Sequence, residues 1–466
     1  MTAFSFSWLD WIVVAAYFVL LVVLSVRRGR HHDSEIGFLL SGRTMSLPAF
    51  VATLVSTFYG GILGVGEFGY SYGLVQLVVL GLPFYVFSLI FAWLVAGRIR
   101  EHESFTLVEA IRNTYGERSG NLASVLIFML VSPAPYILML GLIFQYMSGG
   151  DGDFMMYAIL VALFSVAYVS FGGFDAVVRT DILQVALMFG GFITLFGYAW
   201  SVFGDPITLW NSVPEGHRDP TGGNTLQYIL VWFFIALWTF VDPSFHQRSS
   251  AAKTPSVARK GIVISVICWM VFDFFTLFTA MYGLQILGDI DRAMMVYPYL
   301  ANSILPIGLK GLFFVSLLAT IMSTMDSYMF ISGQTLGRDL LLRYTQKLGS
   351  IAITRLSIFI SAVIGVALII IYPSVIDLWY VIGTVIIPGL LLPVLGIYIP
   401  RLKLQKKYVL AYMLLSSGVS LVWLILGTLH PDTPGAYAYM GIEPFYPGLL
   451  IGLLGLFVLE KKASAL

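Results

Sequence analysis

Hydroxyl side chains gather in one otherwise apolar stretch of the chain. They recur three and four residues apart, at Thr320, Ser323, Thr324 and Ser327, and the carboxylate of Asp326 lies among them. In an α-helix this spacing brings the hydroxyls onto one face. A lone hydroxyl can bond a carbonyl of its own helix, but four on one face exceed that need. Oxygen ligands suit a small hard cation, so the pattern indicates cation binding.

A second apolar stretch, residues 46–66, is interrupted by four glycines at Gly60, Gly61, Gly64 and Gly66. Glycine-interrupted helices expose backbone carbonyls in mid-membrane, where transporters bind ions and substrates. Close packing of helices through small residues gives the same pattern. The sequence leaves both interpretations open.

The composition is that of a membrane protein with many spans. Of the 466 residues, 58% are hydrophobic and 11% charged, whereas a soluble domain carries about 25% charged residues. Lys and Arg number 26 against 25 Asp and Glu, which leaves no basic surplus for nucleic acid. The single Cys268 excludes an internal disulfide or a thiolate metal cluster.

Windows of about 20 apolar residues, the length that crosses a bilayer, predict an all-α protein with about 13 transmembrane helices. The spans are expected at 8–27, 46–66, 72–97, 121–147, 155–172, 181–203, 226–245, 261–285, 309–336, 351–372, 375–398, 408–429 and 440–459. The first is interpreted as a spanning helix because no small-residue cleavage site follows it. No histidine falls inside these spans, which argues against an intramembrane enzyme.

Positive charge predicts the orientation of the spans. Only three of the 26 Lys and Arg residues, Arg218, Arg292 and Lys310, fall on one side of the predicted membrane. The opposite side collects the rest, including the clusters at 27–30 and 461–462. The N-terminus is therefore expected outside and the C-terminus in the cytoplasm, and the compact loops suit a bacterial inner membrane.

The acidic residues of the predicted spans divide into two groups. Most lie near predicted helix ends, and four are interpreted as solvated or capping carboxylates: Asp10, Glu67, Asp273 and Asp377. Asp181 and Asp326 differ, because each belongs to a dense polar cluster. A charge inside a membrane usually faces a cavity or a partner.

Four motifs, in order, resemble those of the sodium:solute symporter family. They are GRTM at 42–45, SFGGFDAVVRTDILQ at 170–184, the Asp-to-Gln-Arg segment at 242–253, and the stretch from GLKG at 308 to Arg338-Asp339. The resemblance implies one transmembrane transporter domain over 1–466 with a leucine-transporter-like fold. Its two five-helix inverted repeats would cover 46–203 and 226–398, with the first helix and two helices at 408–459 peripheral.

The same resemblance implies a sodium-coupled symporter that imports a small organic solute by alternating access. Sodium is then a co-substrate and the only metal, with no cofactor. Its site would lie between the 46–66 and 309–336 spans. The ligands carried over are the backbone carbonyls of Ser56, Tyr59 and Thr320 with the hydroxyls of Ser323 and Thr324.

Some members of the family bind a second cation, and this chain matches that pattern in part. Asp181 and Ser327 fit it, and Asp326 stands where some members have serine. Asp181 could instead cap a helix after Thr180. Proton coupling through Asp181 or Asp326, and a substrate-binding sensor without turnover, remain alternative functions.

The substrate pocket is expected beside the 46–66 span. Six candidate lining residues are Phe58, Gly60, Gln76, Tyr136, Gln145 and Trp238. The wall is aromatic and poor in hydroxyls, which favours a compact organic ion or an amphipathic acid over a sugar. No core arginine is expected to hold a carboxylate.

Overall fold

The computed structural model describes residues 4, 6–26, 35–102, 104–150, 152–345, 349–430 and 437–459. These residues form helices and no β-strand. The basic clusters predicted at 27–30 and 461–462 lie outside the described residues.

Seven spans each consist of one long helix. They are α1 (Trp8–Val26), α10 (Phe154–Phe203), α16 (Pro255–Leu287), α18 (Leu309–Gln334), α19 (Ser350–Ile371), α20 (Val375–Tyr398) and α21 (Lys406–Leu429). Of these helices, α10 kinks in its middle.

Four further spans consist of shorter helices in succession. They are α3 (Leu47–Phe58) with α4 (Ile62–Tyr72), α5 (Leu82–Phe91) with α6 (Gly97–Glu101), α8 (Glu117–Leu130) with α9 (Ala134–Met147), and α13 (Leu226–Ile235) with α14 (Trp238–Val241) and α15 (Pro243–Ala251). Short helices connect or flank the spans: α2 (Glu35–Leu40), α7 (Leu107–Tyr115), α11 (Pro206–Ser212), α12 (Glu215–Arg218), α17 (Val296–Ile304) and α22 (Phe445–Leu454).

Eleven helical stretches among the described residues are long and apolar enough to cross a membrane. Two differences reconcile that number with the thirteen predicted spans. The 50-residue α10 contains both predicted spans at 155–172 and 181–203, and it kinks at Gly173, where φ is 61°. Glycine adopts this left-handed conformation without steric cost. The thirteenth span corresponds to the shorter apolar helix Phe445–Phe457.

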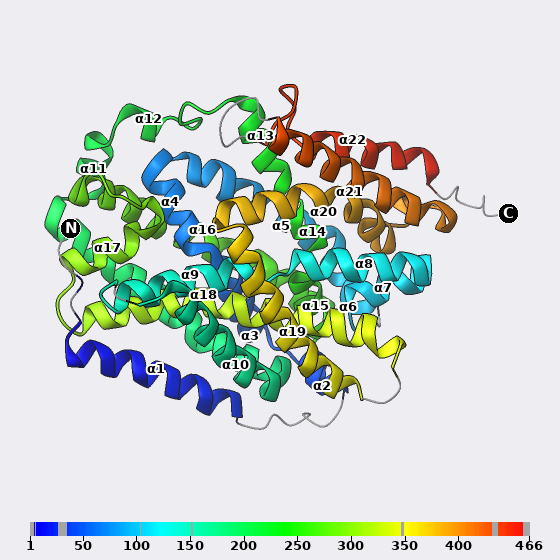
Figure 1. The fold of residues 1–466 in the computed structure, drawn as a ribbon, viewed down its shortest axis with the longest axis horizontal. Helices are drawn as coiled ribbons and strands as arrows, with labels where there is room; N and C mark the ends of the chain where they lie inside the picture. Colours follow the sequence, from blue (N-terminus) through cyan, green and yellow to red (C-terminus); the bar gives the residue numbers. More distant parts are fainter. Residues whose placement is uncertain are drawn as a thin grey trace.

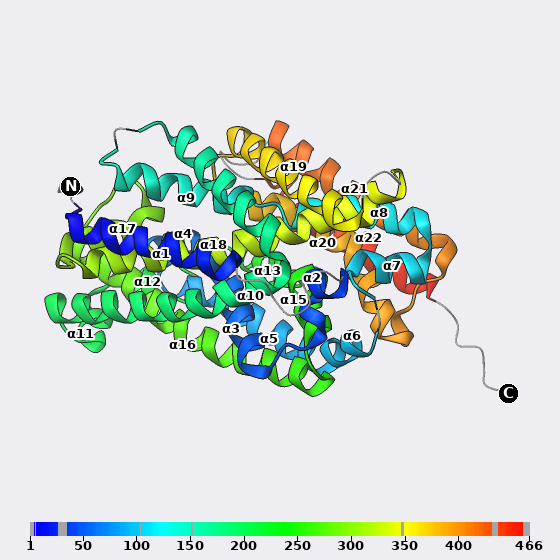
Figure 2. The same ribbon diagram turned by 90° about the horizontal axis from the view of Figure 1, so that it is seen from below.

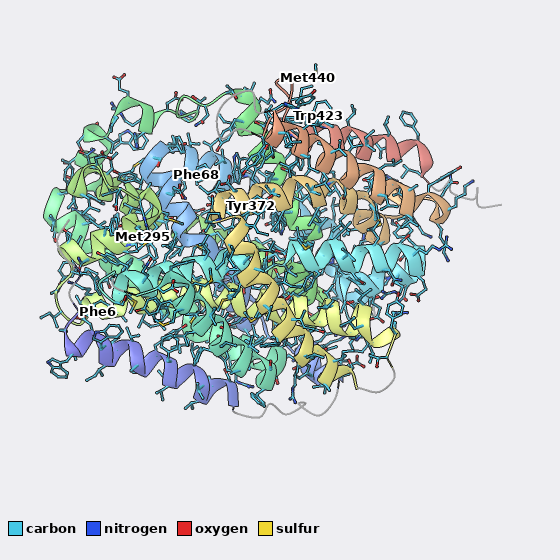
Figure 3. All side chains as sticks on the ribbon, in the orientation of Figure 1. Phe6, Phe68, Met295, Tyr372, Trp423 and Met440 are labelled. Carbon is cyan, nitrogen blue, oxygen red and sulfur yellow. The ribbon has the colours of Figure 1, made fainter. Side chains whose placement is uncertain are left out.

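Helix α18 lies at the centre of the bundle, and the apolar stretch that marks it as a membrane span is completely buried inside the protein. Helix α10 packs along it, and α1 lies at the edge of the molecule (Figures 1 and 2). The interior between helices is filled by side chains (Figure 3). Just before α1, the ring of Phe6 meets that of Phe314 edge-on at 5.1 Å.

Asp10 ties the peripheral α1 to the central helix. Its Oδ1 accepts hydrogen bonds of 2.8 Å from the backbone N–H groups of Gly308 and Gly311, at the N-terminus of α18. A carboxylate at a helix N-terminus satisfies unpaired donors and complements the helix dipole. The expectation that Asp10 is a capping carboxylate is confirmed.

Candidate functional site

The span that begins with α3 breaks in the middle. Helix α3 ends at Phe58, a 3₁₀ turn covers Tyr59–Gly61, and α4 begins at Ile62. A helix end leaves carbonyls without their regular partners. The glycines also allow close contact, because a Cβ at Gly60 would collide with Thr324 and one at Gly61 with the ring of Trp379. The structure therefore shows both an interrupted helix and close packing, and the binding of an ion or solute by its carbonyls stays a prediction.

An oxygen cluster lies between this helix break and α18, formed by Thr53, Thr57, Asp181, Ser323 and Thr324. Thr324 Oγ1 donates to the Thr57 carbonyl at 2.6 Å. Ser323 Oγ donates to Asp181 Oδ1 at 2.6 Å, and Thr53 Oγ1 donates to Asp181 Oδ2. All five residues are buried. Asp181 of α10 thus joins α3 to α18.

The other predicted sodium ligands lie on the same two elements with their side chains engaged elsewhere. Thr320 Oγ1 donates to the Ser316 carbonyl of its own helix at 2.7 Å, and Ser56 Oγ donates to the Ala52 carbonyl at 3.0 Å. The Tyr59 hydroxyl donates to the carbonyl of Trp269 at 2.8 Å. Only their backbone carbonyls were predicted as ligands, and that role stays a prediction.

Arg248 borders the oxygen cluster. It is fully buried, and its Nη2 lies 3.5 Å from Asp181 Oδ2. The same nitrogen donates to Thr57 Oγ1 at 2.6 Å and to Ser327 Oγ at 2.9 Å, while Nε donates to Thr53 Oγ1 at 3.2 Å. Sequence reasoning missed this core arginine, which pairs with a carboxylate of the protein itself; that no core arginine holds a carboxylate of the solute stays a prediction.

Helix α15, which carries Arg248, explains why it was missed. Its sequence PSFHQRSSA is polar, so a hydropathy window ends the span near residue 245. The helix is nevertheless buried along its whole length by surrounding protein rather than lipid. It also brings His246 into a span, which corrects the expectation that no span contains histidine. The His246 Nε2 lies 2.8 Å from the Phe240 carbonyl.

The residues predicted for a second cation separate into two environments. Asp181 and Ser327 both contact Arg248. Asp326 turns instead to the first half of α10, where Ser165 Oγ donates to it at 3.0 Å and the Tyr168 hydroxyl also donates. Asp181 lies inside α10 rather than at its start, so the helix-cap alternative is wrong.

An aromatic pocket opens on the other side of the helix break. It encloses about 980 Å³ including its mouth, and nine of its nineteen lining residues are aromatic. The predicted residues Phe58, Tyr136 and Trp238 line it. Sequence reasoning missed other aromatic lining residues, which come from five different helices: Phe84, Trp232, Phe245, Tyr328 and Trp379.

Three predicted pocket residues do not line it. Gly60 lies behind the wall, where a Cβ would approach Tyr136 Cε1 to 2.7 Å. Gln145 donates to the Gly152 carbonyl at 3.1 Å, near the end of α9. Gln76 is fully buried before α5, near Gly69.

Two carboxylates lie among the aromatic lining residues. Asp242 caps α15, with Oδ1 accepting from the Ser244 N–H at 2.7 Å and Oδ2 from the Tyr328 hydroxyl at 3.0 Å. Asp273 of α16 accepts from the Tyr85 hydroxyl. Asp273 is buried in mid-helix, so its interpretation as a solvated or capping carboxylate is wrong.

The family model of the sodium:solute symporter family matches residues 38–405. The chain belongs to the sodium:solute symporter family. It is 25% identical to the sodium/pantothenate symporter of Escherichia coli (strain K12), over 96% of this chain and 95% of that protein. It is also 25% identical to the sodium/glucose cotransporter of Vibrio parahaemolyticus, over 69% of this chain but only 66% of that relative's length.

A sialic acid symporter, solved in a substrate-bound outward-open state, superposes with a TM-score of 0.76. The alignment covers 97% of each chain at 14% identity, so this likeness shows the fold alone. Together with the eleven apolar spans, it confirms a multi-pass membrane protein with a leucine-transporter-like fold. The named relatives of this family member are transporters, in agreement with the expectation that it is not an enzyme.

Proposed function

We propose that this family member is a sodium-coupled symporter that imports a small organic solute by alternating access. One observation carries the proposal. The Thr324 hydroxyl of the central helix α18 bonds the Thr57 carbonyl just before α3 breaks, and the Asp181 carboxylate bonds Ser323 of α18 and, one turn earlier on α3, Thr53. Clustered oxygens that include a carboxylate are the ligands a hard cation prefers.

Sodium would take the oxygens that now bond one another. The Ser323 and Thr324 hydroxyls would turn their lone pairs to the ion, and the carbonyls of Ser56, Tyr59 and Thr320 would complete its shell. Asp181, already bonded to Ser323, would stabilise the added charge. A second cation near Asp181 and Ser327 competes there with the guanidinium of Arg248.

Coupling to solute would act through the helix break. Gly60 packs against both Thr324 of the oxygen cluster and Tyr136 of the aromatic pocket. An ion that fixes the break therefore also fixes one wall of the pocket, and the two ligands must then favour each other reciprocally. One sodium moving down 100 mV and a tenfold gradient supplies about 3.7 kcal/mol, which supports accumulation of several hundredfold.

For the membrane arrangement we propose an N-terminus outside, a C-terminus in the cytoplasm and a bacterial inner membrane. The distribution of Lys and Arg supports this orientation, and thirteen crossings put the termini on opposite sides. The proposed repeats remain 46–203 and 226–398.

The direct test is uptake by purified protein in proteoliposomes, with labelled amino acids, vitamins, sugars, ammonium compounds and organic acids. An inward sodium gradient should drive accumulation of one solute class, and an equal potassium gradient should not. Uptake driven equally well by a pH gradient without sodium would show that the transporter is coupled to protons instead. Solute binding without uptake under either gradient would indicate a sensor.

A further inference from the structure

We infer that the aromatic pocket accepts a small organic cation, with an ammonium group held between aromatic faces and near two carboxylates. This inference names the substrate class of the symporter and so rests on the proposed function. It depends on the acidic and aromatic residues that line the pocket, and on the absence of basic residues among the described lining residues.

The charged side chains of the pocket are all acidic. Asp242 and Asp273 line it, and none of the nineteen described lining residues is Lys, Arg or His. The Arg248 guanidinium does not line the pocket, but it donates to Thr57 Oγ1 and to the Ser244 carbonyl, which belong to two residues that do, and it also attracts Asp242. It is paired with Asp181. An anionic solute would therefore meet two acidic side chains and no basic side chain among the described lining residues.

Each carboxylate keeps capacity for a ligand. An ionised carboxylate offers about four lone-pair positions. The hydrogen bonds described for Asp242 come from the Ser244 N–H and the Tyr328 hydroxyl, and those for Asp273 from the Tyr85 hydroxyl. These donors hold both carboxylates in position but supply no neutralising positive charge.

Aromatic rings supply the complementary surface. Tyr136 and Tyr328 meet edge-on with centroids 5.5 Å apart, and Phe58 meets Phe84 at 5.3 Å. Trp379 lies over the helix break, where Gly61 makes room for its ring. Aromatic faces attract ammonium groups, most strongly when water is excluded, and tryptophan is the best of the three.

The same lining disfavours an uncharged polyol. A sugar needs several polar groups placed around it, because each buried hydroxyl left unpaired is costly. Apart from the two carboxylates, six of the nineteen lining residues carry a hydroxyl. Those of Thr57, Tyr59 and Tyr328 already bond Arg248, the Trp269 carbonyl and Asp242, and most of the remaining lining is aromatic or aliphatic. An ammonium group with a short hydroxylated or aliphatic substituent fits this chemistry better.

The test is equilibrium binding to the purified full-length protein in sodium. Tetramethylammonium, choline and ethanolamine form the cationic set, and 3,3-dimethylbutan-1-ol is the uncharged analogue of choline with the same shape. Glucose and pantothenate represent neutral polyols and anions. We expect at least one cation to bind, and choline to bind at least about tenfold more tightly than its uncharged analogue.

Two variants link binding to the pocket. Asp273→Asn should weaken binding of the cation about tenfold, since it removes one of the two acidic side chains that line the pocket. Trp379→Phe keeps a ring over the helix break and should weaken binding about threefold. Asp289→Asn, at an exposed position, is the charge-matched control and should leave affinity unchanged.

The outcomes separate the two proposals. The inference is overturned if no member of the cationic set binds, or if choline and its uncharged analogue bind equally. Sodium-driven uptake of glucose or pantothenate without ammonium binding would overturn it and leave the symporter proposal standing. Ammonium binding that is identical in sodium and potassium, with no uptake, would support the pocket assignment and contradict symport.

Discussion

The two sides of the helix break at Tyr59–Gly61 differ in chemistry, since oxygen atoms dominate one side and aromatic rings with two carboxylates line the other. Toward α18 the break meets the Thr324 hydroxyl, and the end of α3 just before it meets the Asp181 carboxylate and the buried Arg248. Toward α20 and α9 it meets the rings of Trp379 and Tyr136. The three residues of this 3₁₀ turn thus lie between an oxygen-rich site and an aromatic one.

The contrast explains how one ion and one organic solute can act on a single element. Hard cations require oxygen atoms at fixed positions, whereas an ammonium group is held by large faces with little demand on direction. Gly60 and Gly61 let both kinds of surface approach the same backbone. Substitutions on either side should therefore show how far ion binding and solute binding depend on each other.

The largest effect is expected from removing the cation beside the oxygen cluster. Arg248→Gln leaves Asp181 buried without its guanidinium, and breaking a buried ion pair costs about 3–5 kcal/mol. The double variant Asp181→Asn/Arg248→Gln should recover part of that loss, because no buried charge is left unpaired. Thermal unfolding in detergent measures both, and a double variant less stable than Arg248→Gln would contradict the pairing.

A smaller loss is expected when the break itself is filled. Gly60→Ala forces a methyl group against Thr324 and Tyr136, and overpacking of this kind costs about 1–3 kcal/mol. Because both sides share Gly60, affinities for sodium and for the transported solute should fall together. The matched control is Gly190→Ala on α10, where a Cβ has nothing within 4 Å. A Gly60 variant that weakens only one ligand would argue against coupling through the break.

The smallest effect is expected at Asp326, which lies one residue from Ser327 in sequence but turns away from the oxygen cluster. Its hydrogen-bond donors are Ser165 and Tyr168, so Asp326→Asn should shift the sodium concentration for half-maximal uptake by less than about twofold, as for a carboxylate that is not a ligand. The corresponding Asp181→Asn variant should shift it at least about tenfold, since hydrogen bonds to charged groups contribute about 1.5–3 kcal/mol. Equal shifts in the two variants would place both carboxylates in one cation site.

The sequence predicted the oxygen-rich side better than the aromatic side for a physical reason. Thr320, Ser323, Thr324 and Ser327 belong to one helix, so their spacing alone indicates a shared face. The pocket aromatics lie on separate helices, and Trp232 and Trp379 are far apart in the chain. No local spacing relates them, and only the packing of the bundle brings them together.

Hydropathy predicted most of the spans but failed where protein, rather than lipid, buries a helix. The polar α15 has no apolar window, yet it is buried among other helices and carries Arg248 and His246 into the core. The interpretation of Asp273 was wrong for a different reason: it lies at the middle of the predicted span 261–285, and the sequence does not reveal its partner Tyr85 on another helix. By contrast, the kink of α10 at Gly173 separates the two spans predicted at 155–172 and 181–203.

The central claim, that sodium binds between the helix break and α18, is tested most directly by sodium-dependent stability. Unfolding of the purified protein would be compared in sodium and in potassium at equal ionic strength. A ligand at a hundred times its dissociation constant stabilises the folded state by about 2.7 kcal/mol. We predict a sodium-specific stabilisation that is lost in Ser323→Ala/Thr324→Ala and kept in Ser332→Ala, whose hydroxyl on the same helix bonds Ser361 instead. An unchanged sodium shift in the double variant would contradict the account.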